Sequence, residues 1–356
     1  MPGLDVRPST PPPAQVRLSH DSPLVIAHRG ASGYRPEHTL EAYRLAIALG
    51  ADFVEPDLVV TADGVLVARH ENEIAATTDV AHHPEFAGRR TTKEVDGRTV
   101  TGWFVEDFTV TELKTLRARE RLPSLREHNQ LYDDRFTVPT FDEILDLVEE
   151  ESLRRGRNIG VCPETKHPTY FAGLGLPHEE ALFDALRRFG SELPVYIQSF
   201  EPWALRRLAQ RSSLPLVQLV DAGGRPPDFD RAGDTRTYSD MLTPSGLREI
   251  STYAQVLGAH KSLLVPRSSD GRLGPPSGVV ERAHDAGLSV FAWTFRNENA
   301  FLPADRRRGV ENAAYGDAFG EYARFLDLGV EAVFTDHPDT AAAAVAESAF
   351  ERARPA

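Results

Sequence analysis

The sequence has little cysteine, and it lacks the long apolar runs that are typical of membrane-spanning proteins. Its 356 residues include one cysteine, two methionines and three tryptophans. The single cysteine, Cys162, excludes an internal disulfide, and its place inside an apolar run predicts a buried, unreactive thiol. No apolar run approaches the roughly 20 residues that a membrane-spanning helix needs, so no integral membrane segment is expected.

Positive charge is also scarce. The chain has 40 Lys and Arg against 53 Asp and Glu, for a net charge of −13. This balance argues against nucleic acid or an anionic membrane surface as a partner. If the substrate is an anion, cations close to the site must hold it. The oligomeric state cannot be inferred from these counts.

The first twenty residues have no helical or strand periodicity and are rich in Pro, Ser and Arg. We expect a flexible N-terminal arm over residues 1–20. This segment lacks the apolar core of a signal peptide, which favours a cytoplasmic location. A periplasmic or secreted protein whose leader is absent from this sequence remains the alternative.

The stretch from residue 25 to 70 carries the strongest pattern in the chain. The apolar run Leu24–Ala27 predicts a buried strand that delivers His28 and Arg29 at its end. Thr39 is placed to cap the helix that follows. A second strand, Phe53–Val54, comes directly after that helix, so the segment predicts a βα unit that opens a parallel sheet.

Charged side chains cluster where this second strand ends. Glu55 and Asp57 are two residues apart, so an extended strand points both carboxylates to the same face, which is costly without a cation. Asp63-Gly64 lies between two β-rich runs and predicts a hairpin. Folding back at that turn brings His70 level with Asp57. Two histidines, an arginine and two carboxylates are therefore expected at one end of a sheet.

Strand and helix patterns alternate over the rest of the chain, which predicts a (β/α)8 TIM-type barrel. We exclude the hairpin return Val65–Arg69 from the parallel barrel strands. A doubly wound open sheet is the alternative. A helix beginning at Thr243-Pro244 is expected to contain Leu257, and the Gly/Pro/Asp-rich segment Asp221–Asp240 is expected to form a mobile loop or lid. Later strands are expected at 159–164, 195–200, 216–220, 263–265, 288–293 and 332–334.

A third carboxylate, Glu164, ends a later strand, and Lys166 follows on the same face. Catalytic residues of such barrels gather at the carboxyl ends of the strands. Three carboxylates without cysteine ligands suit a hard divalent cation, Ca²⁺ or Mg²⁺, and suit zinc poorly. One such ion is the expected cofactor.

These motifs resemble the glycerophosphodiester phosphodiesterase family, and within it the bacterial periplasmic-type branch. The resemblance covers roughly residues 25 to 338 and departs at Glu71, where the family often has Asp. It implies a barrel domain over 21–345 that includes an insertion subdomain over 71–135, with a C-terminal tail over 346–356. The residues that carry it are His28-Arg29-Gly30, Pro36-Glu37-His38-Thr39, Glu55-Pro56-Asp57, His70 and Glu164-Thr165-Lys166.

The resemblance also implies a role for each site residue. Glu55, Asp57 and Glu164 would hold the metal. Hydrolysis of a phosphodiester needs a base and an acid near neutral pH, which His28 and His70 can supply. Arg29 and Lys166 would bind the phosphoryl oxygens, Glu37 would orient Arg29 or His28, and Phe200 and Trp293 would wall a glycerol pocket.

The expected function is metal-dependent hydrolysis of glycerophosphodiesters, such as glycerophosphocholine or glycerophosphoethanolamine, to sn-glycerol 3-phosphate and an alcohol. The alternatives are a phospholipase D-like lyase that forms cyclic phosphates and a non-catalytic phosphate-binding protein. The preferred alcohol, the choice of acid and base between the histidines, and the nucleophile (water or the substrate's own 2-hydroxyl) all stay open.

Overall fold

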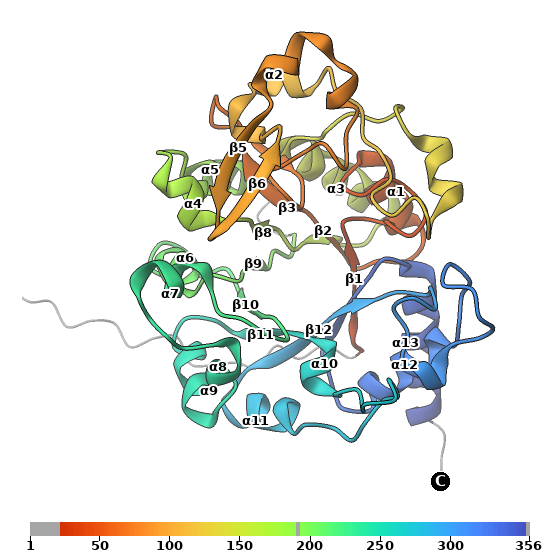
Figure 1. The fold of residues 1–356 in the computed structure, drawn as a ribbon. Helices are drawn as coiled ribbons and strands as arrows, with labels where there is room; N and C mark the ends of the chain where they lie inside the picture. The colour runs from red at the N-terminus through yellow and green to blue at the C-terminus, as the bar shows by residue number, and fades with distance from the viewer. Residues whose placement is uncertain (1–21, 190–192, 354–356) are drawn as a thin grey trace, which may run out of the picture.

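The structure, a computed structural model, describes residues 22–189 and 193–353 (Figure 1). The expected arm over 1–20 therefore lies outside the described residues. The main sheet has 11 strands in the order β4-β3-β8-β9-β10-β11-β12-β13-β1-β2-β7. Their bounds are β1 Leu24–His28, β2 Phe53–Glu55, β3 Asp57–Val60, β4 Leu66–Ala68, β7 Gly160–Val161, β8 Glu164–Thr165, β9 Ile197–Ser199, β10 Leu216–Val220, β11 Val256–His260, β12 Ser289–Phe295 and β13 Ala332–Thr335.

The sheet is curled, and its parallel pairings form a circuit. β1 pairs with β2 on one side and with β13 on the other, and both pairings are parallel. Pro56 separates β2 from β3, and Cys162-Pro163 separates β7 from β8, because a proline has no N–H for the ladder. β2 pairs with β7 and β3 with β8, so each interrupted strand continues the circuit. This mixed α/β arrangement agrees with the predicted TIM-type barrel.

The predicted hairpin after β3 is confirmed. β4 pairs with β3 in antiparallel register, with Leu58 opposite Ala68, and Gly64 has φ +80° in the turn between them. The Arg69 backbone N–H then donates to the Asp57 carbonyl at 2.9 Å. This bond sets His70 directly beyond the carboxylate-bearing end of β3.

Two sequence predictions between residues 243 and 265 were wrong. Leu257 lies in strand β11, and the expected strand Leu263–Val265 overlaps helix α10 (Lys261–Leu264). Both segments are short apolar runs, and periodicity alone does not separate a buried strand from a buried helical turn. The helix that begins after Thr243 is α9 (Pro244–Ile250), and it ends before that strand.

Most helices lie outside the sheet (Figure 1). Thr140 caps α3 in a capping box with Glu143, and Thr109 caps α2 in a capping box with Glu112. The remaining bounds are α1 Leu40–Ala48, α2 Val110–Leu113, α3 Phe141–Arg155, α4 Pro168–Gly173, α5 His178–Arg188, α6 Pro202–Ala209, α7 Pro227–Ala232, α8 Tyr238–Met241, α11 Val279–Asp285, α12 Ala318–Leu326 and α13 Pro338–Ala353.

Residues 71–135 hold an antiparallel hairpin, β5 (Thr91–Val95) and β6 (Arg98–Gly102), with short helical turns around it. The boundaries of an insertion subdomain there stay a prediction. The proposed boundary at 345 falls inside α13, so the expected tail begins within a helix. The segment Asp221–Asp240 contains α7 and the start of α8 and is more regular than the expected loop. The 3-10 turns are η1 Val80–His82, η2 Pro84–Arg89, η3 Val105–Asp107, η4 Glu127–Tyr132 and η5 Ala304–Arg306.

A compact apolar cluster fills the inside of the sheet below the strand ends. It contains Cys162, which is a free and fully buried thiol, as the sequence predicts. Phe53 and Tyr196 pack in this cluster with ring centroids 5.2 Å apart. Within the described residues, no helix has the length and apolar character to cross a membrane.

Gly160 tests the packing of this cluster. A Cβ at Gly160 would lie 2.1 Å from the Phe53 ring, so Gly160→Ala must displace that ring, and we expect it to lower the free energy of unfolding by about 1–3 kcal/mol. Gly88→Ala is the control because a Cβ there meets nothing within 4 Å. Urea denaturation measures both, and equal stability of the two variants would contradict the packing argument.

Candidate active site

Three carboxylates meet where β2 ends and where β3 and β8 begin. Each of Glu55, Asp57 and Glu164 offers an oxygen within 4.8 Å of the other two, and all three residues are buried. Asp57 and Glu164 are direct register partners on the paired strands. The residues therefore form the cluster that the sequence predicts.

Two prolines shape this end of the sheet. Pro56 and Pro163 each stand immediately before a site carboxylate, and the Glu164 backbone N–H donates to the Pro56 carbonyl at 2.9 Å. Because each proline interrupts its own strand, the residue that follows it in the sequence starts a new short strand. The interrupted strands thus set Asp57 and Glu164 side by side.

Arg29 contacts three acidic residues, Glu55 and Asp57 of the cluster and Glu37 beside it. It has φ +63°, and its backbone N–H donates to Glu55 Oε2 at 2.8 Å. Its guanidinium donates to Glu37 at 3.0 and 3.1 Å, and Nε lies 3.3 Å from Asp57 Oδ2. Glu37 also accepts from Arg121 Nε at 2.7 Å. Glu37 thus orients Arg29, which is one of the two partners that the sequence left open.

His38 supports Asp57 from the other side. Its Nε2 lies 2.9 Å from Asp57 Oδ2 and its Nδ1 lies 2.7 Å from the Tyr43 hydroxyl, so the fully buried ring bridges two elements. Although burial opposes ionisation, Lys166 and the His38 contact hold the pKa of Asp57 well below its usual range. Asp57 therefore remains a carboxylate within the cluster.

The other two carboxylates lack this degree of compensation. Burial, followed by the neighbouring acids, raises the pKa of Glu55 well above its usual range. Burial also raises the pKa of Glu164 to about 8, although Lys166 Nζ lies 3.0 Å from Glu164 Oε1. Gln198 Nε2 donates to Glu55 Oε1 at 3.1 Å. A cation bound between these oxygens would offset both the burial and the repulsion between neighbouring acids that raise the two pKa values.

The chemistry of the donor set fits a hard divalent cation. All three candidate ligands are carboxylate oxygens, which Ca²⁺ and Mg²⁺ prefer, and no sulfur or paired imidazole lies in the cluster of described residues. The raised pKa values of Glu55 and Glu164, which show that the protein alone does not stabilise both carboxylates, are the second observation in favour of a bound ion. The identity of the ion does not follow from the geometry.

His28 ends β1 beside the cluster and is tethered to the last strand. Its Nδ1 lies 2.6 Å from Asp336 Oδ1, and Asp336 Oδ2 accepts from Arg126 at 2.6 Å and Arg296 at 2.7 Å. Burial and the Arg29 charge lower the pKa of His28 to about 4, against the effect of Asp336. A neutral ring whose Nδ1–H donates to Asp336 carries its lone pair on Nε2.

His70 has a matching tether. Its Nδ1 lies 2.8 Å from Glu71 Oε1, and burial with the charges of Arg29 and Lys166 lowers its pKa to about 3. Glu71 Oε2 lies 3.8 Å from His167 Nε2, and His167 Nδ1 lies 2.5 Å from Asp96 Oδ2. Glu71, which stands where the family that the sequence resembles often has Asp, thus joins His70 to the turn of the β5–β6 hairpin.

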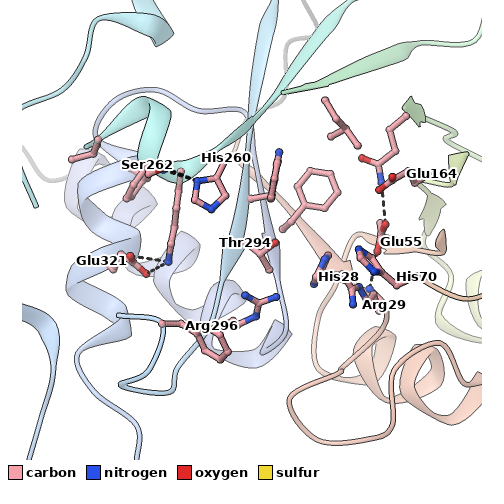
Figure 2. A pocket seen from close by; sticks show the side chains of 18 of the residues that line it. His28, Arg29, Glu55, His70, Glu164, His260, Ser262, Thr294, Arg296 and Glu321 are labelled. Atoms are coloured by element: carbon pink, nitrogen blue, oxygen red, sulfur yellow. Dashed lines mark hydrogen bonds and ion pairs between the residues drawn. The ribbon is translucent and has the colours of Figure 1, made fainter. Parts of the chain in front are cut away.

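Five of these residues, His28, Arg29, Glu55, His70 and Glu164, line a cavity of about 380 Å³ (Figure 2). His28, His70, Glu55 and Glu164 lie at one end of it in Figure 2. Phe200 and Trp293 line it with ring centroids 5.7 Å apart, and the Trp293 indole N–H donates to the Gly258 carbonyl at 3.0 Å. Lys166 Nζ lies 5.7 Å from the Phe200 ring centroid. The structure therefore brings the predicted site residues to one place.

Sequence patterns missed several residues of the site. Asp336 follows the last strand as Glu55 follows the second, so its position at a strand end was the available signal. Arg126 and Asp96 come from the region 71–135, where no local pattern indicates that they reach the strand ends. Gln198 lies inside β9, and nothing in its sequence context points to Glu55.

Comparison with known proteins identifies one enzyme family over nearly the whole chain. The glycerophosphoryl diester phosphodiesterase family matches residues 28–340. A curated relative, glycerophosphodiester phosphodiesterase GDPD6 of Arabidopsis thaliana, is 34% identical, over 90% of this chain and 85% of the relative. The glycerophosphodiester phosphodiesterase of Haemophilus influenzae is 29% identical, over 92% of this chain and 90% of the relative.

Solved structures show the same fold. A putative glycerophosphoryl diester phosphodiesterase from Silicibacter pomeroyi has a TM-score of 0.61 at 24% identity, covering 92% of this chain and 95% of that one. An Oleispira antarctica phosphodiesterase, solved in complex with the product sn-glycerol-3-phosphate, has a TM-score of 0.60 at 21% identity, covering 91% and 97%.

The buried contacts of His167 predict a pH-dependent stability. Burial alone would lower its pKa, but hydrogen bonds with Asp96 and Glu71 raise the pKa to about 9. The stabilisation is complete below the unfolded value of about 6.5 and is lost as the pH rises towards 9. We expect wild type to lose about 1–3 kcal/mol of unfolding free energy over this range relative to His167→Gln.

Urea denaturation at pH 6 and pH 9.5 measures this difference. The exposed His128, changed to Gln, is the control and should keep the wild-type pH dependence. If His167→Gln kept it too, the contact with Asp96 would contribute nothing to stability.

Proposed function

Because the chain belongs to the glycerophosphoryl diester phosphodiesterase family, we propose that this site cleaves glycerophosphodiesters with a bound divalent cation and two histidines. The chain is an enzyme of this family, and hydrolysis to glycerol 3-phosphate is the family's reaction. The observation that carries the finer proposal is the convergence of three carboxylates, Arg29, Lys166 and two tethered histidines where two adjoining cavities share His70 and Glu164.

Glu55, Asp57 and Glu164 would hold the cation, which we propose to be Ca²⁺ or Mg²⁺. When bound, such an ion supplies charge neutralisation at a phosphoryl oxygen and lowers the pKa of a bound hydroxyl or water. Arg29, His38 and Gln198 would hold the carboxylates in place.

Arg29 and Lys166 would bind the phosphodiester. Arg29 has a fixed orientation because Glu37 accepts two hydrogen bonds from it. The carboxylates around Lys166 outweigh the effect of burial and raise its pKa above the usual range, so its ammonium remains charged. Two fixed cations beside the cavity favour an anionic substrate and stabilise charge that develops on the phosphoryl oxygens.

His28 and His70 would move the protons. Each donates Nδ1–H to a carboxylate, which leaves Nε2 to act on the nucleophile or on the leaving alcohol. Positive neighbours help to lower both pKa values, and an anionic substrate beside Arg29 and Lys166 would offset that effect. One ring can then accept a proton while the other donates one. Asp336 and Glu71 act as positioning residues for the two rings.

Phe200 and Trp293 would form the wall of the glycerol pocket. Their perpendicular contact presents two ring surfaces to the cavity, on which the carbon chain of glycerol can pack. The two alternative functions have less support. A lyase acting on lipid would need an exposed apolar rim beside the site, and a phosphate-binding protein would need neither histidine tether.

The metal proposal predicts that exhaustive chelation abolishes release of sn-glycerol 3-phosphate from glycerophosphocholine, and that Ca²⁺ or Mg²⁺ restores it. Glu164→Gln should weaken binding of the ion in calorimetric titration because it removes a charged oxygen ligand. The exposed Glu150, changed to Gln, is the matched control. Full turnover after chelation would contradict the proposal.

The histidine proposal predicts that His28→Ala and His70→Ala each lower kcat by about 10²–10⁴-fold, because each removes a proton-transfer group. His128→Ala, on the surface, should turn over like wild type. A pH–rate profile should lose one limb in each site variant. Near wild-type turnover by His70→Ala, with folding checked by thermal denaturation, would show that this ring transfers no proton.

A further inference from the structure

The cavity continues past Trp293 to a second set of charged residues. Lys261 begins α10, Arg267 follows that helix, Arg296 comes directly after β12, and Glu321 lies on α12. All four line the same 380 Å³ cavity as the carboxylate cluster, and we call them the basic arm. In Figure 2, Glu321, His260 and Ser262 lie at the opposite end from Glu55 and Glu164, and Arg296 lies between the two ends.

The basic arm has more positive than negative charge. Lys261 is buried, and its Nζ lies 2.8 Å from Glu321 Oε1. Arg267 lies 3.8 Å from the same oxygen and donates to the Phe301 carbonyl at 2.5 Å. Glu321 is therefore shared by two cations.

Arg296 adds a third cation. Its Nε donates to Asp336, which Arg126 and His28 also contact, so this carboxylate too is shared. Its guanidinium lies 4.5 Å from the Phe301 ring centroid at the cavity wall. Neither Glu321 nor Asp336 can balance all the cations around it.

The pKa of Lys261 reflects this imbalance. Burial lowers it first, and the charges of Arg267 and Arg296 lower it further, so that Glu321 does not restore the usual value. An anion bound in the arm would place a negative charge beside three cations and reverse that effect. The arm thus has the electrostatics of an anion site inside a walled cavity.

The neighbouring cavity has the opposite character. It measures about 760 Å³ and shares His70, Glu164, Phe200 and Trp293 with the first. Its lining carries the cations Arg98, Lys166, His167 and Arg225 against a larger set of acids, namely Glu71, Glu73, Asp96, Glu164, Glu201, Asp221 and Asp230. A group with a terminal positive charge alone is therefore better placed in that acidic cavity than in the basic arm.

We propose that the basic arm binds the head group of the diester and selects head groups that carry an anionic group, either a carboxylate or a second phosphate. This inference rests on the proposed function, because it assumes that the phosphodiester lies between Arg29 and Lys166. The glycerol and phosphoryl parts are common to every substrate, so the part that varies between substrates is the part that a separate arm can select.

Two substrates that differ by one carboxylate provide the test. sn-Glycero-3-phosphoserine and sn-glycero-3-phosphoethanolamine share glycerol, phosphate and ammonium. We expect wild type to have a kcat/KM roughly tenfold higher for the serine diester, which corresponds to one charge-assisted contact. Arg267→Gln should lower this ratio several-fold, and Arg267→Glu should bring it below one.

Arg272→Gln is the matched control. Arg272 belongs to the same loop, but its side chain is 65% exposed and does not line the cavity, so the variant should keep the wild-type ratio. A second variant, Lys261→Gln with Glu321→Gln, removes both members of the buried pair and avoids an uncompensated buried charge. It should lower the ratio as Arg267→Gln does, with thermal denaturation as the check on folding.

The outcomes separate this inference from the proposed function. Hydrolysis of both diesters without a preference for serine would overturn the role of the arm and leave the function standing. Equal losses on both diesters in Arg267→Gln would also overturn it, because the arm would then hold a part common to all substrates. Absence of hydrolysis of either diester by metal-loaded wild type would contradict the function itself.

Discussion

The mutual repulsion of three buried carboxylates is the constraint on which this site depends. Glu55, Asp57 and Glu164 are buried with an oxygen of each within 4.8 Å of the others, an arrangement that costs free energy wherever cations do not offset it. Arg29 and His38 compensate Asp57, and Lys166 compensates Glu164 in part. The raised pKa values of Glu55 and Glu164 show that this compensation is incomplete, which favours a bound divalent ion. The folded chain therefore holds a strained arrangement that binding relieves, which is a common property of functional sites.

The sequence predicted those parts of the site that short segments determine. His28, Glu55, Asp57 and Glu164 each follow an apolar run, and the ends of parallel strands meet at one edge, so their convergence could be predicted without coordinates. The hairpin that sets His70 beside Asp57 has an Asp63-Gly64 turn, which is a strong hairpin signal in the sequence. Local pattern was insufficient where an apolar run was short and buried on all sides. Leu257 was therefore predicted in a helix although it lies in a strand, and Leu263 was predicted in a strand although it lies in a helix. The alternation of strand and helix around them was predicted correctly.

The contacts that the sequence did not predict are those that tie distant segments to the two site histidines, His28 and His70. Asp336 holds His28 together with Arg126 and Arg296, and Asp96 reaches His167 from the turn of the β5–β6 hairpin. A charged residue on a turn or beyond a strand is most often solvated, so composition gives no reason to assign it a buried partner. Only the register of the sheet and the path of the region 71–135 bring these groups together. The two histidines thus look alike in sequence but depend on different parts of the fold.

The bond between His28 and Asp336 joins residues 308 positions apart in the chain, from the first strand of the sheet to the last. During synthesis the chain emerges from the ribosome at about 5–20 residues per second, so the first strand waits on the order of tens of seconds for its partner. A nascent chain can form the βα unit and the carboxylate cluster while β13 is still untranslated. Such a chain lacks both the neighbour that β1 pairs with and the carboxylate that orients the first histidine. The order of the strands along the sequence therefore delays competence for turnover until the sheet has closed on itself.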